Sequence, residues 1–276
     1  MRIVVTGANG YIGSELIKQL LDKRFEVIAL DVNDTNIDKR AFYEKVDIFN
    51  ELPKDLIKDS DTVIHLAWRN GFNHNHLSHL EDLHKHYLFL QKVIEAGCNN
   101  ISVLGTMHEV GYYEGKMKED VPCNPMSLYG IAKNSLRQAI ECYIKDKNVC
   151  FHWLRAFYIT GNDRHSNSVF GKLLRSAENG QKEFPFTSGK NQYDFISVEE
   201  LCHQIIAASI QKDVSGIINI CSGIPMSLGD RMNQFISEKN LDISLKYGVF
   251  PDRSYDSPVV YGDNSKIKAI LEMNKR

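Results

Sequence analysis

The sequence predicts a doubly wound α/β fold, in which helices cover both faces of a parallel sheet, with a smaller interleaved lobe towards the C-terminus. Through residues 1–161, short apolar runs alternate with longer helical patterns. The apolar runs are continuous, which is typical of parallel strands buried on both faces. The first run leads directly into a glycine-rich turn and then into a helical pattern.

The individual strands and helices follow from the spacing of the apolar residues. In residues 11–23, Leu16, Leu20 and Leu21 share one helical face. Gly97 marks the end of a later helix, because glycine adopts the conformation that commonly follows a helix C-terminus. We expect strands at 2–6, 25–30, 62–66, 101–104 and 151–156, the end of another at 45–48, and helices at 11–23, 79–96 and 125–145.

The alternation weakens after Gly161, where glycine, proline and polar residues become more frequent. We therefore expect residues 1–161 to form the doubly wound domain. Residues 162–276 should form mainly the smaller lobe, with some segments returning to the first domain.

The composition is that of an ordinary globular protein. The 276 residues are 43% hydrophobic and 25% charged, with a formal net charge of −2. This balance gives no reason to expect nucleic acid as a partner. No apolar stretch approaches the roughly 20 residues of a membrane span, and the N-terminus does not resemble a signal peptide. Because the six cysteines form no CxxC pair, we expect a reduced, cytoplasmic protein.

The glycine turn at residues 7–13 predicts a dinucleotide site. Its glycines permit a tight turn and close approach of a pyrophosphate to the backbone, and the helix that follows offers free N–H groups. Asp31, at the end of the next strand, can bind an adenosine ribose and would repel a 2′-phosphate, which favours NAD, with NADP possible. The expected cofactor contacts are Gly7, Asn9, Gly10, Tyr11, Ile12, Gly13 and Asp31.

A tyrosine and a lysine share one face of the helix expected at 125–145. Tyr129 and Lys133 are four residues apart. A nearby ammonium group favours the phenolate and lowers the tyrosine pKa. We therefore expect Tyr129 to be the acid or base of a hydride-transfer reaction, and Lys133 to tune it and bind the nicotinamide ribose.

Two patterns suggest metal sites that other features exclude. His108 and Glu109 resemble the start of a zinc-protease helix, but position 112, where the second histidine would lie, is Tyr112. Five histidines crowd residues 74–86, yet their spacings do not share one helical face and no cysteine lies among them. We expect these to be solvated or loop histidines, some of which could form a lid over the cofactor, and we expect no metal.

These motifs together resemble the extended short-chain dehydrogenase/reductases, in particular the nucleotide-sugar epimerase/dehydratase group, which has a Rossmann fold. The resemblance covers nearly the whole chain. TGANGYIG at 6–13 is similar to the family's cofactor loop, HLAW at 65–68 to its "HLAA" signature, and LYGIAK at 128–133 to its catalytic YxxxK. YDFISV at 193–198 and DNSK at 263–266 are similar to two later segments. The resemblance adds Asp47, Ile48, Leu66, Ala67, Trp68 and Phe157 to the expected cofactor contacts.

The segment GTMHEVG at 105–111 bears on the reaction. Family members carry here a Ser or Thr that binds the substrate oxygen, and Thr106 occupies that position. Dehydratases of the family carry an Asp-Glu pair next, where this chain has Met107 and His108. Because methionine cannot transfer protons, elimination of water is disfavoured. Met107 would contact C5 and C6 of a deoxy sugar, and His108 either contacts the sugar or has no chemical role. Glu109 either braces the loop by accepting backbone N–H bonds or is solvated.

Other expected substrate contacts depart from the family pattern or allow two interpretations. Tyr158 replaces a substrate-binding Asn, and Tyr193 replaces an Arg that often binds the diphosphate, so positive charge would come chiefly from Arg253. Ser168 either binds the diphosphate or is a plain helix N-cap. Phe186 either stacks on the base or is a core aromatic. The expected substrate-binding residues are Thr106, Met107, His108, Tyr158, Ser168, Lys172, Phe186, Tyr193 and Arg253.

The resemblance implies an NAD(P)-dependent reductase of a keto group, with C4 favoured, on a nucleotide-linked 6-deoxy sugar for surface-polysaccharide synthesis. The alternative is an NAD-dependent nucleotide-sugar 4-epimerase, which would use the same Thr106, Tyr129 and Lys133. An alternative from another class is a non-catalytic, NAD-sensing binding protein. The family also implies a homodimer formed through the helices at 79–96 and 125–145.

Overall fold

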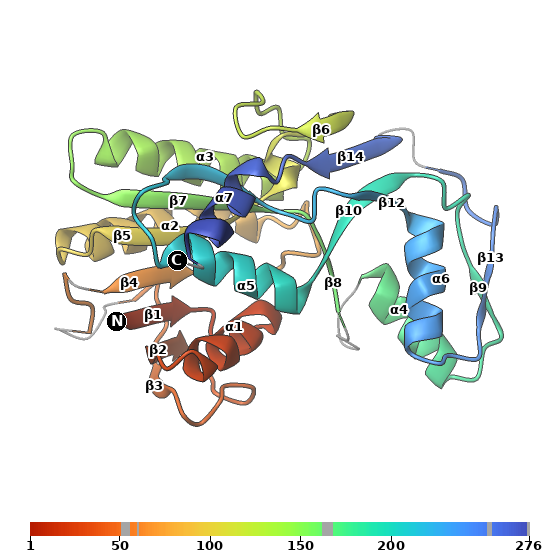
Figure 1. Ribbon diagram of the computed structural model, residues 1–276, viewed down its shortest axis with the longest axis horizontal. Helices are drawn as coiled ribbons and strands as arrows, with labels where there is room; N and C mark the ends of the chain where they lie inside the picture. Colours follow the sequence, from red (N-terminus) through yellow and green to blue (C-terminus); the bar gives the residue numbers. More distant parts are fainter. Residues whose placement is uncertain (51–55, 60, 162–167, 253–255, 275–276) are drawn as a thin grey trace.

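A seven-stranded parallel sheet forms the centre of the molecule in the computed structural model (Figure 1). The structure describes residues 1–276 except 51–55, 60, 162–167, 253–255 and 275–276. The strand order is β11-β7-β5-β4-β1-β2-β3, and each neighbouring pair is parallel. The strands are β1 (Arg2–Thr6), β2 (Glu26–Asp31), β3 (Phe42–Lys45), β4 (Thr62–His65), β5 (Asn100–Thr106), β7 (Cys150–Ala156) and β11 (Gly216–Ile220).

Helices cover both faces of this sheet, because successive strand residues point to opposite sides. On one face, Ile3 and Val5 pack with apolar residues of the first set of helices, and on the other Val4 packs with those of the second. The first set is α1 (Tyr11–Asp22), α5 (Val198–Ser209) and α7 (Ser265–Met273), and the second is α2 (Ser78–Glu95) and α3 (Leu128–Ile144). The predicted doubly wound fold is therefore confirmed.

A smaller lobe lies at one end of the sheet (Figure 1). Its apolar core contains Phe170, Leu173, Phe186 and Phe235. Its elements are β8 (Tyr158–Thr160), α4 (Val169–Glu178), β9 (Glu183–Pro185), β10 (Gln192–Ser197), β12 (Pro225–Ser227), α6 (Leu228–Glu238), β13 (Ser244–Lys246) and β14 (Val259–Gly262), with β6 (Gly115–Met117) paired to β14. The C-terminal half also returns to the main sheet, to which it contributes β11, α5 and α7.

The Asp194 carboxylate joins the lobe to the main sheet. This side chain lies on β10 and is fully buried. It accepts hydrogen bonds from the backbone N–H groups of Ser222, Gly223 and Gly262, and from the Ser222 hydroxyl. A buried carboxylate is tolerated when its oxygens are satisfied in this way. Asp194 thus holds β10, β14 and the turn after β11 together.

Most predicted elements lie within a few residues of their observed bounds, and two differences have clear causes. The strand expected to end at 45–48 is β3, which pairs with β2 and ends at Lys45. Asp47 follows in a tight turn, in which its carboxylate accepts the Phe49 N–H. The helix expected from 125 begins at Leu128, because Ser127 is its N-cap. Among the helices of the described residues, none is long and apolar enough to cross a membrane.

Candidate active site

The predicted cofactor and catalytic residues gather at the carboxyl edge of the main sheet. Gly7 follows β1, Asp31 ends β2, and Thr106 ends β5. Leu66, Ala67 and Trp68 follow β4 directly. Because the strands are parallel, these positions share one edge, which is where doubly wound folds bind ligands.

The glycine loop fits a dinucleotide. Gly7 has a φ of +69°, and a Cβ at this position would lie 2.7 Å from the Ala67 nitrogen. A Cβ on Gly13 would lie 2.1 Å from the Gly7 carbonyl oxygen. Glycine is therefore required at both positions by close backbone contacts. The N-cap Gly10 adds no side-chain hydrogen bond to the start of α1, and a helix N-terminus after such a turn is where a pyrophosphate would bind.

The Asp31 carboxylate lies beside this loop, where the sequence predicts the ribose. Its Oδ2 accepts the Asn9 N–H at 3.0 Å, and its Oδ1 accepts the Val32 N–H at 2.8 Å. The Asn9 carboxamide in turn accepts the Asn36 N–H at 2.6 Å, so the loop after β2 folds against the glycine turn. These bonds hold the carboxylate in position beside the glycine loop.

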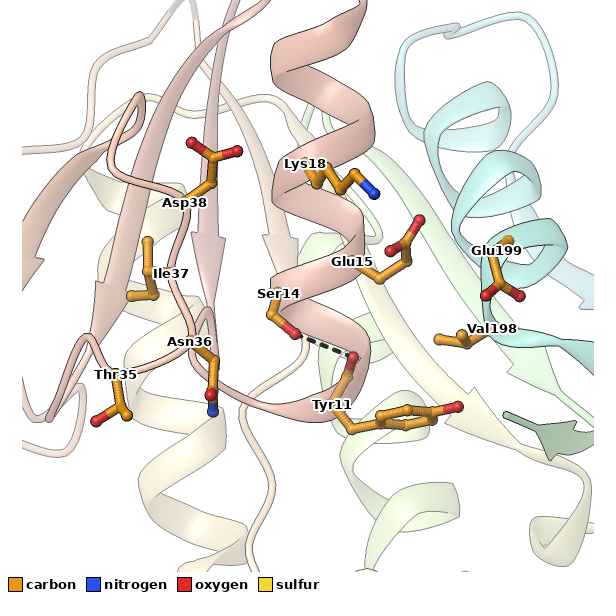
Figure 2. Close-up of a pocket in the computed structure, with 10 residues that line it drawn as sticks. All are labelled: Tyr11, Ser14, Glu15, Lys18, Thr35, Asn36, Ile37, Asp38, Val198 and Glu199. Carbon is orange, nitrogen blue, oxygen red and sulfur yellow. Dashed lines mark hydrogen bonds between the residues drawn. The ribbon is translucent and has the colours of Figure 1, made fainter. Parts of the chain in front are cut away.

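A groove of about 510 Å³ runs along the outer side of α1 (Figure 2). It lies between α1, the loop at residues 35–38 and the start of α5. Tyr11 lines it, but Thr106, Tyr129 and Lys133 do not. The groove is therefore separate from the catalytic candidates.

The first turn of α3 is anchored by a complete set of hydrogen bonds. The Ser127 hydroxyl accepts the Gly130 N–H at 3.2 Å, and the His74 carbonyl accepts the Tyr129 N–H at 2.8 Å. The Asn75 carboxamide accepts the Leu128 N–H at 3.3 Å. Because the first-turn N–H groups of a helix lack intrahelical partners, these contacts fix the start of α3 and the place of Tyr129.

The Thr106 hydroxyl lies close enough to the Tyr129 hydroxyl to affect its pKa. Burial raises the pKa of Tyr129 to about 12, and the Thr106 hydroxyl opposes part of this change. The expectation of a lowered Tyr129 pKa is therefore wrong, because the net change is upward. Loss of solvent outweighs the effect of the Thr106 hydroxyl, and the phenol is protonated at neutral pH.

Lys133 is almost fully buried, with 2% of its surface exposed. Its Nζ donates to the Leu104 carbonyl at 2.7 Å and lies 3.9 Å from the centroid of the Trp68 ring. Burial lowers the pKa of Lys133 to about 7, against the attraction of Glu109. The ammonium thus lies at the sheet edge with few compensating groups.

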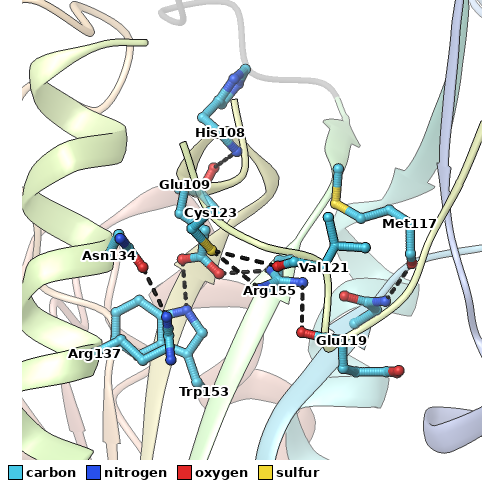
Figure 3. A network of polar contacts seen from close by, with 12 residues as sticks. His108, Glu109, Met117, Glu119, Val121, Cys123, Asn134, Arg137, Trp153 and Arg155 are labelled. Atoms are coloured by element: carbon cyan, nitrogen blue, oxygen red, sulfur yellow. Dashed lines mark hydrogen bonds and ion pairs between the residues drawn. The ribbon is translucent and has the colours of Figure 1, made fainter. Parts of the chain in front are cut away.

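Glu109 braces the turn that carries Thr106 (Figure 3). Its Oε1 accepts the Arg155 Nε at 2.7 Å, and its Oε2 accepts the Trp153 Nε1 at 2.7 Å. The side chains of Glu109 and Arg155 are both fully buried. The predicted bracing role is confirmed, but its expected means was wrong, because the partners are side chains of β7 and not backbone N–H groups.

The turn η1 (Met107–Glu109) also packs closely on α3. A Cβ on Gly130 would lie 2.4 Å from the His108 carbonyl oxygen. The helix can therefore approach the turn only because residue 130 is glycine. This contact brings Tyr129 beside Thr106.

Aromatic rings and histidines surround Tyr129. The His74 ring stacks on the Tyr129 ring at 5.2 Å, and the His79 and Trp68 rings lie at 5.3 and 6.1 Å. The His108 ring lies 4.5 Å from that of His74. Burial, with a smaller effect of His74, lowers the pKa of His108 to about 4, so this ring is neutral at pH 7.

The expectation of solvated or loop histidines at 74–86 is wrong for two of the five. His79 and His86 lie on α2, and each is only 1% exposed. His86 hydrogen-bonds the buried His65 at 3.0 Å, and burial lowers the pKa of His86 to about 3. Among the described residues, no group of three or more His, Cys, Asp or Glu side chains could hold a metal ion.

The expected substrate contacts are not all open. Met107 and Tyr193 are buried in one apolar cluster with Phe157, which was expected to contact the cofactor. The Tyr158 ring lies 4.4 Å from that of Tyr193. Phe186 is 3% exposed in the core of the lobe, which is the position of a core aromatic.

Four further residues were expected at the site. Ser168, Lys172 and Arg253 were predicted to bind the substrate, and Asp47 the cofactor. Ser168 caps α4 by accepting the Gly171 N–H at 3.1 Å. Lys172 and Asp47 are exposed. Arg253 lies outside the described residues.

The partners of Glu109 and the ring cluster around Tyr129 were not expected from the sequence. Arg155 offered a signal, since it is a charged residue inside a mostly apolar strand, FHWLRA. Such a residue must find a buried counter-charge. His74 and His79 offered no comparable signal, because their contacts with Tyr129 join segments about 50 residues apart.

Comparison with known proteins agrees with this geometry. A sequence model of the NAD dependent epimerase/dehydratase family matches residues 3–221. The chain belongs to this family. It is therefore an NAD-dependent enzyme of the extended short-chain dehydrogenase/reductase type, and the glycine loop and Asp31 are the features that fit NAD.

Two curated relatives of this family member come from Aggregatibacter actinomycetemcomitans. A dTDP-6-deoxy-L-talose 4-dehydrogenase (NAD(+)) is 45% identical over 271 residues, which cover 95% of this chain and 99% of the relative. A GDP-6-deoxy-D-talose 4-dehydrogenase is 26% identical over 287 residues, which cover 98% of this chain and 91% of the relative. Among solved structures, MoeE5 in complex with UDP-glucuronic acid and NAD superposes with a TM-score of 0.82 at 22% identity, over 99% of this chain and 93% of that one.

Breaking the brace should destabilise the fold. Glu109→Gln keeps the shape of the side chain but leaves the Arg155 guanidinium buried without a counter-charge. We expect the free energy of unfolding to fall by about 3–5 kcal/mol. Urea denaturation followed by circular dichroism measures this change.

Two further variants complete this test. Glu114→Gln, at an exposed position of the following loop, should change the free energy of unfolding by less than about 0.5 kcal/mol. Glu109→Gln combined with Arg155→Met should recover part of the loss, because both charges are removed. A Glu109→Gln protein as stable as the Glu114→Gln protein would show that the ion pair is not a brace.

Proposed function

We propose that this protein is an NAD-dependent 4-dehydrogenase of a nucleotide-linked 6-deoxy sugar, which acts as a reductase of the C4 keto group in the reverse direction. The observation that carries the proposal is that Tyr129, one helical turn before Lys133 on α3, lies close enough to the Thr106 hydroxyl for Thr106 to affect its pKa. The substrate class is supported by the relative at 45% identity, a dTDP-6-deoxy-L-talose 4-dehydrogenase. A dTDP-linked sugar is therefore the first substrate to test.

The two hydroxyls would bind the reacting oxygen of the sugar. Both lie at the carboxyl edge of the sheet, where the cofactor loop also opens. When bound, NADH supplies a hydride to the C4 carbon. Tyr129 donates a proton to the C4 oxygen, and Thr106 stabilises the developing negative charge by a hydrogen bond.

The protonation state of the site suits a proton donor. Because the pKa of Tyr129 is raised to about 12, its phenol carries a proton at neutral pH. In the oxidation direction the same oxygen must accept a proton from the sugar alcohol. A charged Lys133 favours that step, since an ammonium stabilises a phenolate.

The turn after β5 does not carry the acid–base pair that elimination of water requires. Met107 has no titratable group, and its side chain is packed in an apolar cluster. The His108 ring is neutral at pH 7, with a pKa lowered to about 4. The turn after β5 therefore offers the hydroxyl of Thr106 but no carboxylate pair next to it, which favours oxidoreduction over dehydration.

A substrate panel tests the proposal. We expect dTDP-linked 4-keto-6-deoxy sugars to be reduced with NADH, with one cofactor oxidised for each sugar formed. UDP-, GDP- and CDP-linked sugars, and NADPH, complete the panel. Absorbance at the nicotinamide band follows the cofactor, and NMR follows the sugar. Interconversion of the C4 alcohols without net cofactor oxidation would instead identify a 4-epimerase, and no turnover with any member would refute the proposal.

Tyr129→Phe should remove the proton donor and keep the ring packing. We expect kcat to fall by about 100-fold or more, because positioned acid catalysis contributes at least this factor. The affinity for NAD, measured by calorimetry, should change little. Tyr112→Phe, at an exposed position, is the matched control and should keep its activity. Activity that survives in Tyr129→Phe would exclude the proposed acid.

A further inference from the structure

The Trp68 ring lies between His86 and the Lys133 ammonium. Its plane is nearly parallel to that of His86, with the ring centroids 4.4 Å apart and an angle of 9°. The Lys133 Nζ lies 3.9 Å from the Trp68 centroid. Because a parallel ring fills one face of the indole, the ammonium takes the other face.

Trp68 is held at its edge as well as on its face. The indole Nε1 donates to His79 Nδ1 at 3.0 Å. His79 Nε2 lies 2.9 Å from the Asn73 carbonyl oxygen, which can only accept. His79 therefore carries its proton on Nε2 and accepts the indole N–H on Nδ1. These contacts leave the indole little freedom to turn away from Lys133.

Few other groups compensate the Lys133 charge. The Leu104 carbonyl accepts one hydrogen bond. The nearby acid, Glu109 on η1, already binds Arg155 and Trp153 through its two oxygens. His65 on β4 and His86 on α2 are neutral, because burial lowers the pKa of both. Tyr129, on the same helix as Lys133, is protonated. The electron-rich indole face is thus a main favourable contact of the ammonium.

We propose that Trp68 is a positioning residue for Lys133, whose indole face keeps the buried lysine protonated and directed at the sheet edge beside Tyr129. The kinetic test of this proposal rests on the proposed function, whereas the contact between Trp68 and Lys133 does not. A desolvated cation–π contact is stronger than an exposed one, and Lys133 is almost fully buried. Removing the ring face should therefore favour the neutral amine.

The titration of Lys133 tests the proposal without any substrate. NMR of the lysine Cε and Nζ atoms follows the ammonium, and the Lys133 signal is identified by its loss in Lys133→Met. Trp68→Met should lower the pKa of Lys133 by about one unit, and Trp68→Phe should lower it less. Site-specific tetrafluoro-tryptophan at position 68 keeps the shape of the ring but removes its negative face, so it should act like Trp68→Met.

Kinetics supply a second arm in the holoenzyme. If a charged Lys133 is required, activity is lost as the pH rises through its pKa, and Trp68→Met or the fluorinated ring should move this loss about one unit to lower pH. Tyr143→Leu is the matched control, because it removes a cation–π contact of α3 with Lys147. This variant should leave the NMR titration of Lys133 and the pH dependence of activity unchanged.

Two results would overturn the proposal. The first is an unchanged Lys133 titration with the fluorinated ring, since a purely steric role of Trp68 would give this outcome. The second is an equal loss of activity at every pH with no shift of the profile. If the unsubstituted protein reduces no sugar, the proposed function fails, while the titration still decides the role of Trp68.

Discussion

The buried ion pair between Glu109 and Arg155 is the contact on which the arrangement of the site depends. It joins the turn after β5 to the centre of β7, and Trp153 adds a second bond to the same carboxylate. Both charged side chains are fully buried, so neither can be satisfied by water if its partner is removed. The turn therefore has one favourable position, and Thr106 at its start faces Tyr129.

The first turn of α3 meets this braced turn from the other side. Gly130 allows the helix to pack on the His108 backbone, while His74 and Asn75 bind the free N–H groups of the helix start. Thr106 and Tyr129 are thus held by two independent sets of contacts. Preorganised donors of this kind require little rearrangement when charge develops on a substrate oxygen.

Burial sets the charge of the site before any ligand binds. It keeps the Tyr129 phenol protonated and brings the pKa of Lys133 to about 7. Small changes around Lys133, such as loss of the Trp68 ring face, would therefore alter its charge near neutral pH. A ligand that excludes more water or adds negative charge would do the same, which couples binding to the protonation state of the site.

The parallel sheet and the positions at its carboxyl edge were predictable from sequence, because they follow from local periodicity and from glycine geometry. Gly7, Asp31 and Thr106 each end or follow a recognisable apolar strand. The brace was only half predictable, because Glu109 finds its partners 44 and 46 residues further along the chain. The stacking of Trp68 on His86 depends on how α2 packs over the sheet, which local patterns do not specify.

The transfer of one hydride to C4 of a sugar is the central chemical claim. It is measured most directly by supplying NADH with deuterium at both C4 positions of the nicotinamide and a dTDP-linked 4-keto-6-deoxy sugar. Proton NMR of the product should then show loss of the sugar C4–H signal, with one deuterium incorporated for each NADH oxidised. A product that carries ordinary hydrogen at C4 would exclude direct hydride transfer from NADH to the sugar.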